Sequence, residues 1–89
     1  MKSRYKFSII IPSYNPGKKI IHCLKSIEKS INYFSKKNDL IYEVLVINDG
    51  GDKIDLKFNH NIKNLKKIKL KKNRGVGFTR QQGANISKY

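Results

Sequence analysis

Cysteine, acidic side chains and long apolar runs are all scarce in this sequence. It contains one cysteine, Cys23, and six Asp plus Glu among 89 residues. A single cysteine excludes an internal disulfide framework and any cysteine-based zinc cluster, and it fits a reducing compartment. No apolar run approaches the ~20 residues that a membrane-spanning helix requires. We therefore expect a cytoplasmic protein, with the inner face of the membrane as the alternative location.

The scarcity of acidic residues leaves a strongly basic chain. Twenty Lys plus Arg against six Asp plus Glu give a formal net charge of +14 and a pI near 10.1. Such a surface attracts polyanions and phosphorylated small molecules. The net charge therefore indicates that a partner is anionic, but it does not identify the partner. The hydrophobic content of 38% is too high for a disordered tail and suits one small domain over residues 1–89.

The first third of the sequence has the pattern of a strand followed by a helix. Residues 6–12 read KFSIIIP, a β-branched apolar run typical of a strand that is covered on both faces. Asn15 is placed to cap a helix whose first residue is Pro16. Five apolar side chains at spacings of four and three fall on one stripe of that helix: Ile20, Leu24, Ile27, Ile31 and Phe34. Cys23 lies at the edge of the stripe, where we expect a small core residue and not a reactive thiol.

A second strand is predicted after a polar break at residues 35–39. Residues 42–47 read YEVLVI, and the turn residues from 48 onward end the run. Two strands joined by a helix form a βαβ unit, whose strands lie parallel. Residues 12–15 and 48–52 should therefore emerge side by side at the carboxyl edge of the sheet.

Two further segments complete the predicted fold. Residues 66–72 read KKIKLKK, in which Ile68 and Leu70 alternate with lysines, the period-two pattern of a strand with one face in the core. Lysine side chains on an edge strand hinder pairing with the strands of another chain, so we place this strand at an edge. We expect a parallel sheet in the order three, two, one. Residues 76–88 are predicted to be helical. The expected fold is α/β with three layers and helices on both faces of the sheet.

The carboxyl edge carries one candidate binding residue, Asp49. In open parallel sheets, ligands bind outside the carboxyl ends of the strands, and a carboxylate after the second strand can accept hydrogen bonds from a ribose or a base. A plain turn is the competing interpretation, since Asp-Gly is a common turn pair. The first strand is followed by PSYNPG and not by G-x-G-x-x-G, and no P-loop pattern occurs. Both absences argue against a nicotinamide or flavin cofactor and against a P-loop nucleotide site.

Three segments resemble the first three signature segments of family 2 glycosyltransferases. They are FSIIIPSYN at 7–15, YEVLVINDGGD at 42–52 and NRGVGFTRQQGAN at 73–85, in the family's order and at about its separations. The resemblance implies a partial GT-A fold, which is Rossmann-like. It also implies transfer of a sugar from a nucleotide diphosphate sugar, commonly a uridine diphosphate sugar, with inversion at the anomeric centre, in the synthesis of a glycan or polysaccharide.

The resemblance further implies which residues bind the nucleotide sugar. Four of them form the loop that ends the first strand: Pro12, Ser13, Tyr14 and Asn15. Tyr14 would lie against the base, and Asp49 would bind the uracil or the ribose. In the third segment the matching residues are Asn73, Gly75 and Arg80. Arg80 could pair with the diphosphate, because its fixed fork of donors suits phosphate oxygens.

The sequence departs from the family pattern at a few of these positions. Asn48 and Gly51 stand where the family has Asp and Ser, and Thr79 and Gln81 depart from the third segment. The Asp49 carboxylate is retained. The departures at 48 and 51 bear on the fine specificity that the resemblance implies.

The resemblance also implies a divalent metal, Mg or Mn, held by an Asp-x-Asp motif, and a carboxylate base further along. Neither occurs in residues 1–89. Departure of a nucleoside diphosphate needs the cation, and deprotonation of an acceptor hydroxyl needs the base. We therefore expect no catalytic residue and no metal ligand here. We interpret residues 1–89 as the N-terminal nucleotide-sugar-binding part of a glycosyltransferase domain, ending before the Asp-x-Asp motif and inactive alone.

The expected partners follow from the resemblance and from the charge. They are a nucleotide diphosphate sugar and a glycan or lipid-linked acceptor. The lysines could also draw the chain to a membrane surface that carries the acceptor. Apolar surface left exposed by the absent part of the domain could drive self-association.

Two interpretations from another class stay open. The run RGVGFT at 74–79 approximates the RNP1 motif of an RNA-recognition module, although Val76 and Gln81 replace stacking aromatics. The second is nonspecific polyanion binding, because residues 56–89 are rich in Lys and Arg and contain no acid. Nucleic acid is the less favoured partner on both counts, since the RNP1 match is partial and the lysines also suit a solvated edge.

Overall fold

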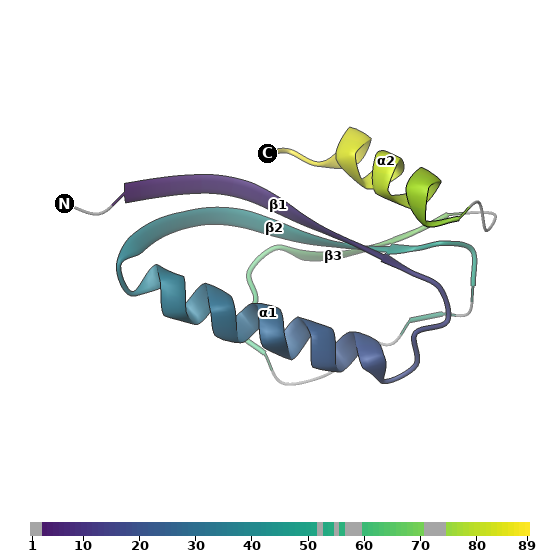
Figure 1. The fold of residues 1–89 in the computed structure, drawn as a ribbon, viewed down its shortest axis with the longest axis horizontal. Helices are drawn as coiled ribbons and strands as arrows, with labels where there is room; N and C mark the ends of the chain where they lie inside the picture. Colours follow the sequence, from purple (N-terminus) through teal and green to yellow (C-terminus); the bar gives the residue numbers. More distant parts are fainter. Residues whose placement is uncertain (1–2, 52, 55, 57–59, 71–74) are drawn as a thin grey trace.

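Two helices enclose a short parallel sheet (Figure 1). The computed structural model describes residues 3–51, 53–54, 56, 60–70 and 75–89. Its elements, in chain order, are β1 (Ser3–Ser13), α1 (Lys19–Ser35), β2 (Asn38–Asn48), β3 (Leu65–Lys69) and α2 (Val76–Ile86). The helices α1 and α2 lie on opposite sides of the strands in Figure 1. The predicted three-layer α/β fold with helices on both faces is therefore confirmed.

The strands are parallel and β2 lies in the middle. The sheet order is β1-β2-β3, which confirms the predicted order three, two, one. β1 pairs with β2 from Ser3 opposite Asn38 through Ser13 opposite Asn48. β3 pairs with the second half of β2, which ends with Asn48 opposite Lys69. The carboxyl ends of β1 and β2 therefore emerge at the same edge of the sheet.

The face of the sheet that α1 covers holds the apolar core. Tyr42, Val44 and Val46 alternate along β2 and pack with Ile20 and Leu24 of α1 in one buried cluster. Burying such side chains contributes roughly 1.5–3 kcal/mol each. The periodicity of four and three in α1 matches this face, because residues at that spacing share one side of a helix.

The opposite face is covered by α2. Gly83 lies so close to β1 that a Cβ there would overlap Cγ2 of Ile10. Thr79, one helical turn earlier, is fully buried, and its hydroxyl donates a hydrogen bond of 2.9 Å to the Gly75 carbonyl. Small residues on this side of α2 therefore let the helix approach the sheet closely.

The first helix begins later than predicted. α1 starts at Lys19, its N-cap residue is Lys18, and no side chain caps it. Asn15 has a φ of 46° and so adopts the left-handed region, which a helix N-cap does not use. The prediction that Asn15 caps a helix starting at Pro16 is wrong. Residues 14–18 form a turn between β1 and α1, so Asn15 lies too far from Lys19 to be its N-cap.

Other boundaries also differ from the predictions. β2 begins at Asn38, inside the segment predicted as a polar break, because it pairs there with the start of β1. β3 ends at Lys69, and residues 71–72 of the predicted strand lie outside the described residues. α2 ends at Ile86, two residues before the predicted end.

Two side chains predicted to be in or beside the core of α1 are exposed. Phe34 is 57% exposed, and Cys23 is exposed as well. Both side chains line a cavity between α1 and β1. In the described residues, no other element fills this cavity, and the two side chains are therefore exposed. None of the described helices combines the length and the apolar character needed to cross a membrane.

Candidate functional site

The ends of β1 and β2 are joined by a backbone hydrogen bond. The Asp49 N–H donates to the Ser13 carbonyl at 2.8 Å, directly after the last paired residues of the two strands. Pro12 lies within the sheet, opposite Ile47. Ser13 and Asp49 are both buried, at 9% and 4% exposure. The juxtaposition predicted at the carboxyl edge is therefore present, and Asp49 is held in a fixed position there.

The Asp49 carboxylate also holds the start of α2. Its Oδ2 accepts a hydrogen bond of 3.1 Å from the Gly75 N–H. Gly75 has a φ of 89°, a conformation that favours glycine, and α2 begins at the next residue. A negative charge beside a helix N-terminus is favourable, because the first N–H groups lack partners within the helix. Asp49 thus connects three elements, β1, β2 and α2, at one point.

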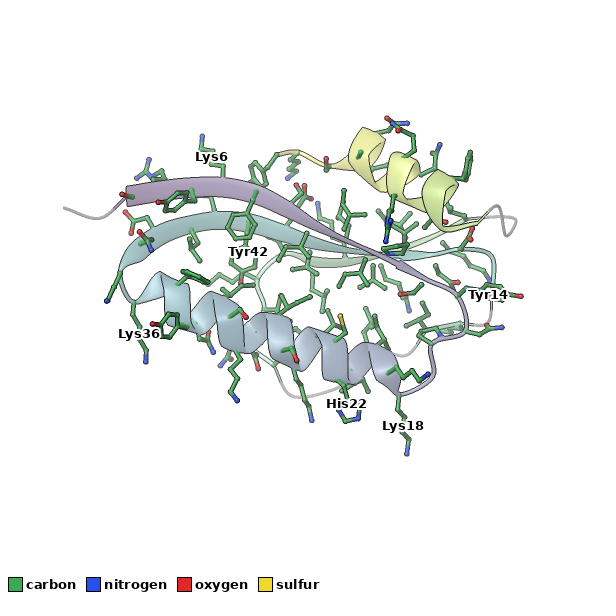
Figure 2. All side chains as sticks on the ribbon, viewed as in Figure 1. Lys6, Tyr14, Lys18, His22, Lys36 and Tyr42 are labelled. Carbon is green, nitrogen blue, oxygen red and sulfur yellow. The ribbon has the colours of Figure 1, made fainter. Side chains whose placement is uncertain are left out.

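The loop that follows β1 lies directly on the loop that follows β2. A Cβ built at Gly51 would be 2.5 Å from the Asn15 Oδ1 and 2.9 Å from the Tyr14 Cδ2. The Tyr14 ring is 53% exposed, and Figure 2 shows it where β1 leaves the sheet. The loop of Tyr14 and Asn15 therefore contacts the loop that carries the buried Asp49. The sequence analysis named Gly51 only as a departure from a pattern, and the contact was not foreseen.

Asn48 fixes the loop that carries Asp49 and Gly51. Its side chain is 2% exposed, and its Oδ1 accepts a hydrogen bond of 3.2 Å from the Gly51 N–H. Its backbone carbonyl accepts a hydrogen bond of 2.8 Å from the Leu70 N–H. The side-chain amide of Asn48 therefore stabilises the turn that carries the Asp49 carboxylate.

The remaining predicted residues differ in their placement. Arg80 is exposed on α2, directly after the buried Thr79. Asn73 lies outside the described residues. The structure therefore brings together Pro12, Ser13, Tyr14, Asn15, Asp49 and Gly75, and it leaves the Arg80 side chain in solvent.

This arrangement of a parallel βαβ unit with a carboxylate at its edge agrees with a comparison of the sequence with protein families. The model of the family described as Glycosyl transferase family 2 matches residues 8–89, which is nearly the whole chain. The chain belongs to glycosyl transferase family 2. No curated protein and no solved structure matches it.

Membership of glycosyl transferase family 2 indicates the class of reaction that the domain serves. It supports glycosyl transfer as the function of the domain, with a nucleotide sugar and an acceptor as the substrate classes. The parallel sheet with its two helices is consistent with part of the Rossmann-like GT-A fold. The RNA-recognition interpretation is wrong, because residues 76–79 lie in α2 and not on a sheet that could stack bases.

The described residues do not provide the divalent metal site that the family generally uses. Among them, no three His, Cys, Asp or Glu side chains gather as metal ligands would. The Asp49 carboxylate is instead bonded to the Gly75 N–H. We therefore derive no step of the reaction through a metal ion.

Positive charge borders the edge on the α1 side. A pocket of about 420 Å³ runs beneath the loop after β1, and Lys18 and Lys53 line it together with Asn15. Both lysines are exposed. The sequence analysis did not single them out, since only the general excess of lysine pointed to them.

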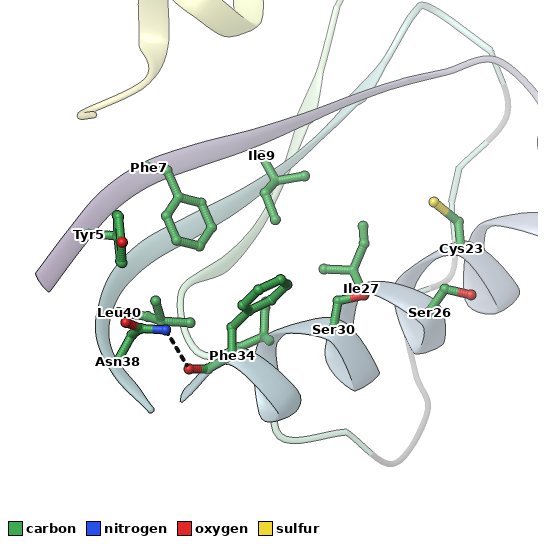
Figure 3. Close-up of a pocket in the computed structure, with 11 residues that line it drawn as sticks. Tyr5, Phe7, Ile9, Cys23, Ser26, Ile27, Ser30, Phe34, Asn38 and Leu40 are labelled. Atoms are coloured by element: carbon green, nitrogen blue, oxygen red, sulfur yellow. Dashed lines mark hydrogen bonds between the residues drawn. The ribbon is translucent and has the colours of Figure 1, made fainter. Parts of the chain in front are cut away.

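A larger cavity lies away from this edge (Figure 3). Its volume is about 760 Å³, and its walls are mostly apolar side chains from the first half of β1 and the second half of α1, including Tyr5, Phe7, Ile27 and Phe34. Cys23 also lines it. Figure 2 places Tyr14 and Lys36 at opposite ends of the molecule, so this cavity is separate from the carboxyl edge.

A second buried carboxylate, Glu43, lies on the α2 face of β2. It is 2% exposed, and its Oε2 accepts hydrogen bonds from the Ser8 hydroxyl at 2.7 Å and the Lys88 N–H at 2.6 Å. Lys66 Nζ is 4.0 Å from its Oε1. The Lys88 N–H is the main cause that lowers the pKa of Glu43, against the opposing effect of burial, and Ser8 and Lys66 lower it further. Glu43 is therefore held ionised at neutral pH.

Proposed function

We propose that this chain binds a nucleotide diphosphate sugar, and specifically a uridine diphosphate sugar, at the carboxyl edge of its sheet. The domain would present this donor for inverting transfer of the sugar to a glycan or lipid-linked acceptor. One observation carries the proposal: Asp49 is a buried carboxylate fixed at the point where β1, β2 and α2 meet. Ligands of open parallel sheets bind at this position.

Asp49 is suited to recognise the polar edge of a nucleoside. A carboxylate accepts up to about four hydrogen bonds, and the one from the Gly75 N–H orients this group. The N–H of uracil and the hydroxyls of ribose are donors of this kind. Hydrogen bonds to an ionised acceptor are roughly twice as strong as neutral ones. We therefore assign recognition of the uridine to Asp49.

The neighbouring side chains would contact the rest of the donor. The half-exposed Tyr14, whose ring carbons lie near Gly51, would offer a flat surface to the base, and stacking of a base on an aromatic ring is worth about 1–3 kcal/mol. Lys18 and Lys53, which line the pocket beside Asn15, would supply positive charge for the diphosphate, and the exposed Arg80 would have to reach it from α2. Gly75 contributes by placing the start of α2 against Asp49.

The proposal is tested by titrating the folded chain with uridine diphosphate and following amide NMR signals. We expect shifts centred on Tyr14, Asp49 and Gly75. Asp49→Asn keeps the shape of the side chain and removes its charge, so it should weaken binding at least tenfold, as expected for a hydrogen bond to a charged group worth about 1.5–3 kcal/mol.

Asp39→Asn is the matched control, because Asp39 is an exposed carboxylate at the other end of β2. It should leave the affinity for uridine diphosphate unchanged. The proposal fails if the unmodified chain shows no shifts at this edge, or if both Asn variants bind uridine diphosphate as well as the unmodified chain does.

We also propose that these 89 residues alone transfer no sugar. The sequence contains no Asp-x-Asp motif, and the two buried carboxylates among the described residues, Asp49 and Glu43, each accept a backbone N–H from a residue that flanks α2. Incubation with a uridine diphosphate sugar and Mn²⁺ should release no uridine diphosphate above the buffer rate. Release that disappears in Asp49→Asn would contradict this.

A further inference from the structure

Gly51 lies in a space that has no room for a side chain. A Cβ there would be 2.5 Å from the Asn15 Oδ1, and 2.9 and 3.0 Å from two carbons of the Tyr14 ring. Contacts of this length are shorter than real Cβ atoms make, so a neighbour would have to move. The neighbouring Gly50 has a φ of 77°, whereas Gly51 is not among the glycines with positive φ. Space, and not backbone conformation, therefore disfavours a side chain at position 51 unless Tyr14 and Asn15 move.

The loop that carries Gly51 cannot easily shift to make room. The Asn48 side chain, which is buried, accepts a hydrogen bond of 3.2 Å from the Gly51 N–H. Two residues earlier, the Asp49 N–H is bonded to the Ser13 carbonyl at 2.8 Å. An added side chain at 51 would therefore be accommodated by the partners on the other loop, Tyr14 and Asn15.

The loop after β1 is shaped to meet Gly51. Asn15 adopts a left-handed φ of 46°, which Asn tolerates better than most residues. Tyr14 is 53% exposed, and two of its ring carbons lie near Gly51. The position of this ring thus depends on the absence of a side chain at 51.

We propose that Gly51 is a positioning residue for nucleotide binding: by lacking a Cβ, it lets Tyr14 and Asn15 lie on the loop after β2 and so sets the place of the Tyr14 ring on the loop that carries Asp49. This inference rests on the proposed function, because the ring is positioned for the base of the nucleotide. A side chain at 51 would displace the ring, so the stacking surface and the carboxylate would no longer face the same ligand.

The test compares Gly51→Ala with Gly77→Ala, in which the same change is made where nothing lies within 4 Å. Without ligand, nuclear Overhauser contacts between the Tyr14 ring and residue 51 should be present in the unmodified chain and in Gly77→Ala, and weakened in Gly51→Ala. With uridine diphosphate, Gly51→Ala should lose about tenfold or more in affinity, the amount expected for loss of one stacked base. Gly77→Ala should bind uridine diphosphate as the unmodified chain does.

A second comparison distinguishes displacement of the Tyr14 ring from misfolding of the variant. Tyr14→Ala should lose affinity for uridine diphosphate to a similar degree, and adding Gly51→Ala to it should cause little further loss, because the displaced group is already absent. Dispersed amide signals confirm that each variant is folded. If the loss of affinity in the double variant equals the product of the losses in the two single variants, the two residues act independently and the positioning role of Gly51 is wrong.

The outcomes separate this inference from the proposed function. If the unmodified chain does not bind uridine diphosphate at all, the proposed function fails, and the nucleotide role of Gly51 fails with it. If the unmodified chain binds, but Gly51→Ala keeps the Tyr14 contacts and the full affinity, the proposed function stands and the inference about Gly51 is wrong.

Discussion

At the scale of single residues, Glu43 shows how a buried charge is stabilised without a close ion pair. Lys66 Nζ is 4.0 Å from its Oε1, whereas the Lys88 N–H and the Ser8 hydroxyl both donate to Oε2 at shorter distances. The Tyr89 N–H in turn donates to Ser8 at 3.2 Å. Hydrogen bonds to the ionised form lower the pKa of Glu43 although burial opposes this.

The lowered pKa of Glu43 predicts a dependence of stability on pH. Glu43 releases its proton more readily in the folded chain than in the unfolded chain, whose carboxyl has the ordinary pKa of 4.5. Its contribution to the free energy of unfolding is therefore fully present above about pH 4.5 and is lost as the pH falls through the lowered folded value. Urea unfolding at about pH 7 and at stepwise lower pH measures this loss.

Glu43→Gln is the control for this prediction, because it keeps the size of the side chain and removes the titration. The variant should be less stable than the unmodified chain at neutral pH, and the difference between them should shrink in acid. A difference in free energy of unfolding that stays constant from neutral to acid pH would contradict the lowered pKa of Glu43.

At the scale of elements, α2 is attached to β2 by a carboxylate near each of its ends. Asp49 accepts the Gly75 N–H before the first turn, and Glu43 accepts the Lys88 N–H after the last. Between these two points Gly83 lies against Ile10 of β1. The helix is therefore fixed along its length, which is what places Gly75 at the candidate site.

The close packing of α2 predicts opposite effects for two glycine substitutions. Alanine in a helix interior is favoured over glycine by about 0.8–1.0 kcal/mol, so Gly77→Ala, in the first turn of α2 and with nothing within 4 Å, should raise the free energy of unfolding by less than that. Gly83→Ala would place a methyl group onto Ile10, and overpacking costs typically about 1–3 kcal/mol. Thermal unfolding of the two variants beside the unmodified chain measures both effects. A higher melting temperature for Gly83→Ala would show that α2 does not approach β1 this closely.

At the scale of the whole molecule, the net charge of +14 is the dominant property. Lysines are exposed on β3 and along α1, and Lys18 and Lys53 line the pocket beside the candidate site. A nucleoside diphosphate is attracted by such a field, and so is any polyanion. Charge therefore supports the class of ligand, and Asp49 with Tyr14 would supply the selectivity.

The same charge predicts that salt stabilises the chain. Raising NaCl from about 0.1 M to 1 M shortens the screening length from about 10 Å to about 3 Å, which weakens repulsion among like charges. We expect the melting temperature to rise by about 4–8 °C for each kcal/mol recovered. A variant with Lys29→Glu and Lys36→Glu, both exposed, should respond less. A melting temperature that does not rise with salt would indicate that self-repulsion is negligible.

The sequence by itself determined the order and direction of the elements. The apolar run in 6–12 and the run in 42–47 are local patterns, and the intervening stripe of α1 has a period that only a helix satisfies. A βαβ unit then requires parallel strands with a common carboxyl edge. Asp49 lies two residues after the second run, so its place at that edge was predictable.

Only the tertiary structure decided how the site is assembled. The bond from Gly75 to Asp49 joins residues 26 positions apart, and the contact of Gly51 with Tyr14 joins two loops that no local pattern relates. The start of β2 at Asn38, in a polar segment, likewise depends on pairing with β1. Local propensity and periodicity report which element a residue enters. Distances between residues far apart in the chain are set only when the elements pack, and those distances decide whether a carboxylate, a ring and a glycine form one surface.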